Sequence, residues 1–328
     1  MYGLFTQSLI KTIMNPNDIA CSACKRKEAV FFRPYSGQRL CKKCFLESVE
    51  AKVRATITRY NMFSFSDKIA VAVSGGKDSL NLLQILAKIE HNRPKASLVA
   101  LTVDEGIKGY RDEALKLASA ECAKLGVDHR TVSFKKLFGF TLNELVEKKR
   151  QEADVKLTPC AYCGMLRRRA LNLAAREICA NKLATGHTLD DEAQTVLMNI
   201  FRGDVQRLAK EKPVTDKVHP NLVQRVKPFC EIPENESALY AYLKKTRFQA
   251  TPCPYAFEAL RNDFRAMLNQ METKHAGTKF TIFNTLERLR PVLQTIPSDT
   301  NYADCVECGE PSSGGLCKVC QILREMSC

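Results

Sequence analysis

One stretch of the sequence limits what this chain can fold into. The apolar run Ile69–Val73 leads directly into SGGKDS, at positions 74–79, and then into Leu80–Ile89, whose apolar residues have helical period. A strand, a glycine-containing turn and a helix in this order form one unit of a parallel α/β sheet. The adjacent glycines let backbone N–H groups approach an anion, and the following helix contributes its positive dipole end. The loop is therefore predicted to bind phosphate.

Strand-like and helical segments continue to alternate through the central region. The strand-like runs that follow are Leu98–Val103, Val127–Phe134 and Lys182–Thr185, and the helical ones are Tyr110–Leu125, Gly164–Ala180 and Leu189–Phe201. Such alternation indicates a parallel sheet covered by helices on both faces. The predicted fold class is α/β, with a doubly wound parallel sheet. Two further helical stretches, Tyr255–Glu272 and Phe280–Leu289, lead towards the C-terminus.

The chain is long enough for several structural units. It has 328 residues, and its 45% hydrophobic and 26% charged residues exclude a disordered or low-complexity chain. Its apolar runs fall far short of the roughly 20 residues that cross a bilayer, so no membrane segment is expected. The predicted units are an N-terminal extension (1–20), a zinc ribbon with a connector helix (21–60), the α/β domain (61–254), a helical segment (255–299) and a C-terminal zinc ribbon (300–328).

Cysteines provide the second strong pattern, because eight of the 15 stand in two double CxxC motifs. The first motif contains Cys21, Cys24, Cys41 and Cys44, and the second contains Cys305, Cys308, Cys317 and Cys320. Four thiolates at such spacing can close a tetrahedron around one Zn²⁺, and a four-cysteine site is structural because it leaves no open coordination position. No secretory signal precedes the cysteines and the N-terminal stretch lacks arginine, so we expect a reducing, cytoplasmic location.

Three other cysteines lie outside the double CxxC motifs. Cys160 and Cys163 form a CxxC in TPCAYCG, and Cys253 stands in the similar segment TPCPY. Three thiolates can hold a four-iron cluster and leave one iron open to bind sulfide. They can instead provide a persulfide-carrying cysteine with a resolving cysteine, or a three-cysteine zinc site, and the residues alone leave these interpretations open. The remaining internal cysteines, expected to be buried in the core, are Cys122, Cys179 and Cys230.

The chain is strongly basic. Its 50 Lys and Arg residues against 36 Asp and Glu residues give a formal net charge of +14, which favours a polyanionic partner such as nucleic acid. Arg167, Arg168 and Arg169 stand together shortly after Cys163 on a predicted helix. Consecutive helical residues point in different directions, so one of these arginines is expected to face the phosphates and the others to face RNA or solvent.

Several polar residues follow predicted strands, at the carboxyl edge of the sheet where doubly wound folds bind ligands. Asp104 ends the second strand, and Gly186, His187, Asp190 and Asp191 form the turn after the fourth. Two adjacent carboxylates near a phosphate loop favour Mg²⁺ binding or proton transfer. The structural alternatives are a turn cap for Asp104 and helix N-caps for Asp190 and Asp191.

The sequence SGGKDS after a first strand resembles the PP-loop of the ATP pyrophosphatases. That family cleaves ATP between the α and β phosphates and adenylates its substrate. The residues that the resemblance places at the leaving pyrophosphate and its Mg²⁺ are Ser74, Gly75, Gly76, Lys77, Asp78 and Ser79. It further implies that Asp104, Gly186 and His187 lie beside the nucleotide.

A larger set of motifs narrows the resemblance. The segments LVALTVDEGIKGYRDEAL, CAYCGMLRRRALNLAAR and TGHTLDDEAQTVLMNIFRGD, with both double CxxC motifs, resemble the tRNA 2-thiouridine synthesis family over nearly the whole chain. The resemblance implies an enzyme that adenylates the C2 oxygen of the wobble uridine and replaces it with sulfur. Its cofactors would be ATP, Mg²⁺, two Zn²⁺ and a [4Fe-4S] cluster held by Cys160, Cys163 and Cys253. Arg167 stands at the position of a phosphate-contacting residue, and Asp191 at that of a catalytic carboxylate.

The same resemblance implies the partners. They are tRNA, a ubiquitin-like sulfur carrier with a C-terminal thiocarboxylate, and either a second thiolation subunit or a second copy of the chain. Other functions remain open, because related enzymes thiolate the T-loop uridine or a cytidine of tRNA, and a zinc-ribbon scaffold would bind tRNA without chemistry. The intact Asp78 and Asp191 argue against the scaffold, and the two flanking cysteine motifs argue against the cytidine enzyme.

Overall fold

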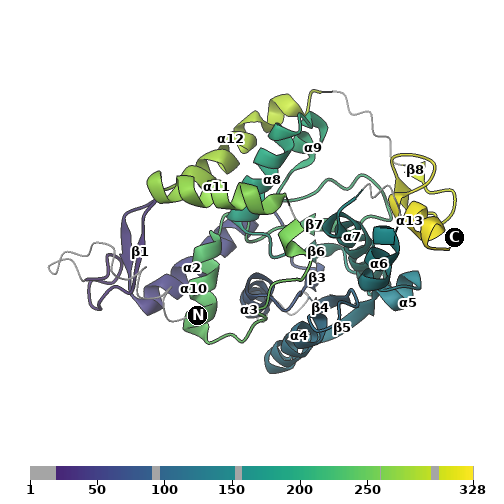
Figure 1. The fold of residues 1–328 in the computed structure, drawn as a ribbon. Helices are drawn as coiled ribbons and strands as arrows, with labels where there is room; N and C mark the ends of the chain where they lie inside the picture. Colours follow the sequence, from purple (N-terminus) through teal and green to yellow (C-terminus); the bar gives the residue numbers. More distant parts are fainter. Residues whose placement is uncertain (1–19, 91–96, 152–156, 259, 297–302, 328) are drawn as a thin grey trace.

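The computed structural model describes residues 20–90, 97–151, 157–258, 260–296 and 303–327, and a parallel sheet forms the centre of this part of the chain (Figure 1). Its strands are β3 (Lys68–Ala72), β4 (Ser97–Asp104), β5 (Asp128–Ser133), β6 (Lys182–Ala184) and β7 (Gln224–Val226). They lie in the order β5-β4-β3-β6-β7, and every neighbouring pair is parallel. The chain builds from β3 out to β5, then returns to the other side of β3, so the predicted doubly wound α/β fold is confirmed.

Helices cover both faces of the sheet. The helices between and after the strands are α3 (Lys77–Glu90), α4 (Arg111–Leu125), α5 (Phe134–Phe138), α6 (Leu142–Gln151), α7 (Pro159–Glu177), α8 (Leu189–Phe201), α9 (Val205–Lys210), α10 (Glu234–Lys244), the short 3₁₀ helix η1 (Ala256–Glu258), α11 (Arg261–Lys274) and α12 (Thr278–Leu293). Alternate residues of β3 serve opposite faces: Ile69 and Val71 pack with α3, whereas Ala70 packs with Ala174 and Ala175 of α7. Helices α11 and α12 both pack against α8, in a separate layer at the top of Figure 1.

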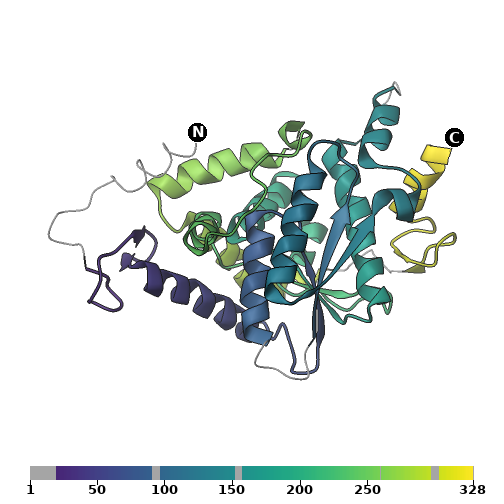
Figure 2. The same ribbon diagram turned by 90° about the horizontal axis from the view of Figure 1, so that it is seen from below.

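Each end of the described chain carries a small cysteine-containing unit. The N-terminal unit is a hairpin of β1 (Phe31–Arg33) and β2 (Gln38–Leu40) followed by α2 (Lys42–Arg59). The C-terminal unit pairs β8 (Ala303–Asp304) with β9 (Pro311–Ser312) and ends in α13 (Lys318–Ser327). The two units lie on opposite sides of the α/β core in both Figure 1 and Figure 2. The predicted domain boundaries remain a prediction, and the predicted extension lies almost wholly outside the described residues.

The structure adds elements that the sequence patterns did not show. Strand β7 and helix α10 were not predicted, because a three-residue edge strand reading QRV has too few apolar positions to show a strand period. Helix α7 begins at Pro159 rather than at Gly164, because Thr158 is its N-cap and accepts a hydrogen bond from the Ala161 amide. Cys160 and Cys163 are therefore residues of the helix itself.

Two further expectations can be compared with the structure. The predicted helix over 255–272 is divided into η1 and α11. Cys122 and Cys230 are buried as expected, but Cys179 is exposed, because it lies in the turn after α7 with a positive φ of 55°. None of the helices in the described ranges is both long and apolar enough to cross a membrane.

Candidate active site

The predicted phosphate loop connects β3 to α3 and is shaped by one hydroxyl. Ser79 Oγ accepts a hydrogen bond from the Ser74 amide (3.0 Å) and donates one to the Gly76 carbonyl (2.9 Å). These bonds fold the loop back over the first turn of α3, where N–H groups are unpaired within the helix. The geometry is that of an anion-binding turn at a helix N-terminus.

Two glycines allow this loop to sit tightly against its neighbours. Gly75 has a φ of +85°, and a Cβ there would lie 2.6 Å from the Ala114 carbonyl oxygen of α4. A Cβ on Gly186 would lie 3.1 Å from the backbone of Asp78 and Ser79. Gly186 therefore lets the turn after β6 pass directly beside the phosphate loop.

The first residues of α3 carry a cation and a carboxylate. Lys77 Nζ lies 3.0 Å from Asp78 Oδ2 and 2.8 Å from Glu234 Oε1. The other oxygen, Asp78 Oδ1, is buried and has no hydrogen-bond partner in the described part of the chain. Burial raises the pKa of Asp78. A buried carboxylate oxygen without a partner beside a phosphate loop fits a Mg²⁺ ligand.

Two residues that the sequence patterns did not single out join the phosphate loop to β4. Arg111 Nη1 donates to the Ser74 carbonyl, Arg111 Nε donates to the Val103 carbonyl, and Arg111 Nε lies near Glu105 Oε2, each at 2.8 Å. Glu105 and Arg111 are 3% and 5% exposed, so this is a buried ion pair. The segment DEGIKGYRD could have indicated both residues, because it places their charges just after a buried strand.

Asp104 precedes this pair and shapes the same turn. Its Oδ1 accepts a hydrogen bond from the Gly106 amide at 2.9 Å. The geometry is that of the turn cap considered as the alternative for this residue. Contact between Asp104 and a nucleotide remains a prediction.

Cys160, Cys163 and the segment of Cys253 come together in space. Cys160 and Cys163 lie in the first turns of α7, and Cys160 Sγ donates to the Tyr255 carbonyl (3.5 Å), two residues beyond Cys253. Cys163 and Cys253 pack against the same apolar cluster. Burial raises the pKa of Cys163 to about 11, an effect that Arg167 opposes and that the other two thiols and Glu105 reinforce.

The spacing of these three sulfurs differs from that of the four-cysteine groups. Within the described residues, two groups have all their ligand atoms within 4.8 Å of one another, and the three-cysteine site is not among them. Ligands of a single Zn²⁺ lie about 2.3 Å from the metal and so about 3.8 Å from each other. The three cysteines therefore lack, in the described residues, the compact spacing of a single-zinc site.

The three consecutive arginines of α7 have three different environments. Arg167 Nη1 lies 3.7 Å from Glu105 Oε1, between the buried ion pair and Cys163. Arg168 is exposed and has no ion-pair partner among the described residues. Arg169 is 10% exposed, and it pairs with Glu310 (2.8 Å) and donates to Cys317 Sγ (3.1 Å). The expectation that Arg169 faces RNA or solvent is therefore wrong, because the C-terminal unit covers it.

The turn from β6 into α8 holds the remaining candidates. Asp191 Oδ2 accepts from the Thr188 amide (3.0 Å) in a capping box, so Asp191 is the third residue of α8 and Thr188, not Asp191, is the N-cap. Asp190 accepts from the Glu234 amide (2.7 Å) and pairs with Lys279, so it connects α8 to α10 and α12. Desolvation lowers the pKa of His187 to about 4, which keeps its imidazole neutral near pH 7.

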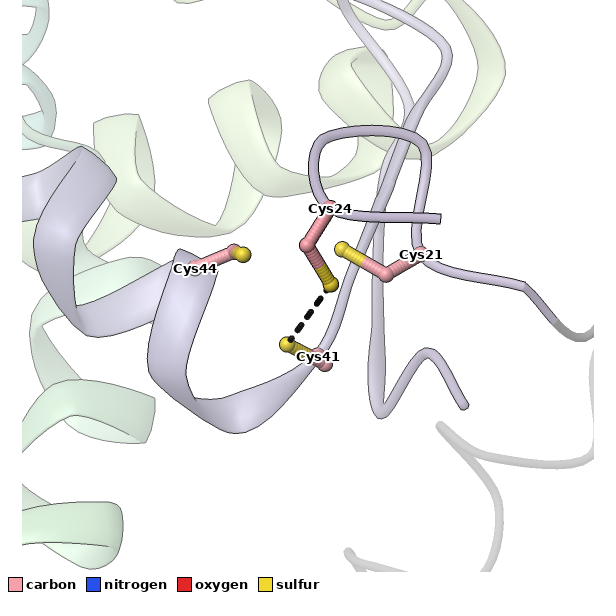
Figure 3. A group of neighbouring side chains, drawn as sticks. All are labelled: Cys21, Cys24, Cys41 and Cys44. Atoms are coloured by element: carbon pink, nitrogen blue, oxygen red, sulfur yellow. Dashed lines mark hydrogen bonds between the residues drawn. The ribbon is translucent and has the colours of Figure 1, made fainter. Parts of the chain in front are cut away.

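Both four-cysteine groups have the arrangement that a tetrahedral metal requires. In the N-terminal group the four thiols point toward one another, with Cys41 and Cys44 at the start of α2 (Figure 3). Cys24 Sγ and Cys41 Sγ are 3.9 Å apart, and Cys308 Sγ and Cys317 Sγ are 3.8 Å apart. These separations match the edge of a zinc–thiolate tetrahedron, about 3.8 Å. The donor sets therefore fit Zn²⁺.

Two family models match the chain. Residues 46–272 match a PP-loop domain, which contains the phosphate loop and the three clustered cysteines. Residues 21–46 match the N-terminal LIM domain of the 2-thiouridine synthetase TtuA. The second match covers the N-terminal four-cysteine group.

Proteins similar to the chain over most of its length carry consistent names. The tRNA 2-thiolation protein NcsA of Haloferax volcanii is 36% identical, covering 93% of this chain and 98% of that protein. The cytoplasmic tRNA 2-thiolation protein 1 of Candida glabrata is 35% identical, covering 93% and 85%. A solved structure, the U34-tRNA thiolase NcsA from Methanococcus maripaludis with its [4Fe-4S] cluster, is 33% identical with a TM-score of 0.80, covering 94% and 96%. The expected family is confirmed: the chain belongs to the PP-loop tRNA 2-thiolation proteins, a family of sulfurtransferases.

Proposed function

We propose that this chain is an ATP-dependent tRNA sulfurtransferase that converts the wobble uridine to 2-thiouridine. The observation that carries the proposal is the continuous contact between the phosphate loop and the three cysteines. Arg111 joins the Ser74 carbonyl to Glu105, and Glu105 reaches Arg167 beside Cys163. The buried Glu105–Arg111 pair and the half-exposed Arg167 thereby connect an adenylation site to a sulfur-handling site.

In this proposal the phosphate loop binds ATP for the adenylation step. The loop backbone and the N-terminus of α3 would hold the β- and γ-phosphates, and Asp78 Oδ1 would ligate Mg²⁺ because it has no other partner in the described chain. The uridine C2 oxygen attacks the α-phosphorus and pyrophosphate leaves. Arg167 is placed to stabilise the charge that develops on the α-phosphate.

In this proposal the three cysteines serve the sulfur-transfer step. A sulfur nucleophile attacks C2 of the adenylated uridine, and AMP leaves with the original oxygen. Cys160, Cys163 and Cys253 would hold a [4Fe-4S] cluster, which supplies an open iron for a sulfur ligand. The [4Fe-4S] cluster of the similar M. maripaludis thiolase supports this assignment. A cysteine persulfide is the second candidate for the sulfur source.

The remaining parts of the proposal concern metals, partners and location. Two Zn²⁺ would occupy the four-cysteine groups, whose geometry fits. Sulfur would come from a ubiquitin-like carrier with a C-terminal thiocarboxylate, and the chain would work with a second thiolation subunit or a second copy of itself. The name of the C. glabrata relative supports a cytoplasmic location. The role of Asp191 as a catalytic carboxylate also belongs to this proposal.

Nucleoside mass spectrometry of tRNA tests the function. Cells lacking this chain should lose 2-thiouridine at the wobble position, and the wild-type chain should restore it. Asp78→Ala should not restore it, whereas Asp112→Asn, which changes an exposed acid in the first turn of α4, should. Loss of T-loop 2-thiouridine or of 2-thiocytidine would select one of the rival thiolases. Full restoration by Asp78→Ala would favour the non-catalytic scaffold.

A further inference from the structure

A large groove lies between the catalytic helix α7 and the C-terminal cysteine unit. Its volume is about 1150 Å³, and its walls come from α7, α9, the segment that ends in β7, the end of α12 and residues 310–321. We call it the ribbon groove. The residues of its lining that matter here are Arg168, Lys210, Arg225, Glu310, Ser313 and Lys318.

The ribbon groove is basic, and its acids are already engaged. Six of its described lining residues are Lys or Arg, and two are acidic. Glu310 pairs with both Arg169 (2.8 Å) and Arg176, and Asp216 pairs with Lys212 (2.7 Å). The acids therefore leave an excess of positive charge in the groove.

Arg168 is the clearest part of this excess. It extends from α7 without an ion-pair partner among the described residues. Desolvation lowers its pKa, and the guanidinium groups of Arg225, Arg167 and Arg207 lower it further. Arg167 and Arg207 have acidic partners, Glu105 (3.7 Å) and Asp204 (3.1 Å), but Arg168 has none among the described residues. A bound anion would offset the charge of Arg168. The structure therefore has the electrostatics of an anion site in the groove.

The ribbon groove reaches the catalytic edge of the sheet at two places. Arg168 directly follows Arg167 and interacts electrostatically with Cys163. Arg225, in β7, interacts electrostatically with His187 in the turn after β6. A ligand lying in the groove would therefore extend towards both the cysteine site and the phosphate-loop side of the active site.

We propose that the ribbon groove binds the phosphodiester backbone of the RNA strand next to the target nucleotide, with Arg168 as a direct phosphate contact. This inference rests on the proposed tRNA thiolation. The groove is too large for one phosphate and has a different lining from the loop that would hold ATP. A row of basic side chains that tracks an extended polyanion is the usual way proteins hold a nucleic-acid backbone.

The test compares three variants. Arg168→Ala removes the charge, Arg168→Lys keeps it, and Arg130→Ala is the matched control, since Arg130 is an exposed arginine of β5 at the opposite edge of the sheet. The probe is an unmodified tRNA transcript with uridine at the wobble position, in filter binding at several salt concentrations. Arg168→Ala should bind about tenfold more weakly and lower the slope of log Kd against log salt by about 1. Arg168→Lys and Arg130→Ala should stay near wild type, and ATP affinity should be unchanged in all three.

A second measurement tests directly whether the transcript lies in the ribbon groove, without relying on a change in affinity. A photocrosslinking phenylalanine at Ser313, on the ribbon wall, should crosslink to the transcript, and the same group at the exposed Ser36 of the N-terminal unit should not. The groove assignment would be overturned if Arg168→Ala and Arg130→Ala had equal tRNA affinity and equal salt dependence of Kd, or if Ser313 gave no crosslink. The proposed function would not be affected by either result. Failure of the wild-type chain to bind the transcript would overturn the proposed function itself.

Discussion

The two four-cysteine groups have the same donors and nearly the same sulfur spacing, but they are attached to different parts of the molecule. The N-terminal group continues into α2, whose residues Phe45, Val49 and Val53 are at most 1% exposed in the main core. The C-terminal group packs into a second apolar cluster, together with Tyr162 and Leu166 of α7. One group is therefore part of the scaffold, and the other contacts α7, the helix that carries Cys160 and Cys163.

Charged side chains make this difference sharper. Arg33, beside the N-terminal group, forms a two-pronged pair with Glu236 of α10 (3.0 and 2.6 Å), and both side chains are buried. Arg169 of α7 instead donates directly to a sulfur of the C-terminal group. The comparison teaches that two similar four-cysteine groups can be attached differently, one to the main core and the other to α7 beside Cys163.

The largest expected effect concerns the three-cysteine site, which shares no ligand with either group. Cys253→Ser should abolish the brown colour and the iron content of anaerobically prepared protein, because a three-thiolate cluster loses one anchor. Both zinc ions should remain, because each four-cysteine group keeps all its ligands. Metal analysis by mass spectrometry gives both values. Colourless protein that is fully active after anaerobic reconstitution would favour the persulfide.

The second prediction tests the scaffold role of the N-terminal unit. Arg33→Ala leaves Glu236 buried without its guanidinium, so it should cost about 3–5 kcal/mol of unfolding free energy. Arg54→Ala, which breaks the half-exposed pair with Glu50 (3.5 Å), should cost at most about 1 kcal/mol. Urea unfolding followed by circular dichroism measures both. Equal costs would remove the distinction between the two attachments.

The third prediction concerns the arginine next to the cysteines. Arg167→Ala should slow thiolation by on the order of 10²–10³, as expected when one preorganised donor to a developing charge is lost. Arg167→Lys should recover only part of that rate. Single-turnover thiolation measures the rate, with Arg168→Ala assayed at saturating tRNA as the control. Full turnover by Arg167→Ala would mean that another residue faces the α-phosphate.

The smallest expected effect tests the link between α7 and the C-terminal group. Arg169→Ala removes a hydrogen bond to Cys317 Sγ, so the affinity of that group for Zn²⁺ should fall by about 10–100-fold. Competition with a zinc chelator should show one weakened site and one unchanged site. Arg39→Ala, beside the N-terminal hairpin, is the control. Two unchanged sites would show that Arg169 acts only through its pair with Glu310.

Local sequence was sufficient to predict much of the fold and of the site. The strand–loop–helix order around SGGKDS and the CxxC spacings are short-range patterns, and a chain of that pattern has few ways to bury its apolar strands or satisfy a metal. The turn role considered for Asp104 was likewise visible, because its side chain bonds the Gly106 amide two residues away. The N-cap considered for Asp191 is instead Thr188, three residues earlier, whose amide Asp191 bonds.

Only the tertiary structure decided the contacts between residues that are far apart in the sequence. Cys160 meets the segment of Cys253 only because α7 and the chain before η1 pack together, and no local pattern contains that distance. Arg167, Arg168 and Arg169 are identical in sequence terms, yet the helical rotation of α7 sends one to Glu105, one into the ribbon groove and one to a cysteine sulfur. The sequence determined which groups this protein possesses, and packing determined what each group contacts, since side-chain environment depends on neighbours that are remote along the chain.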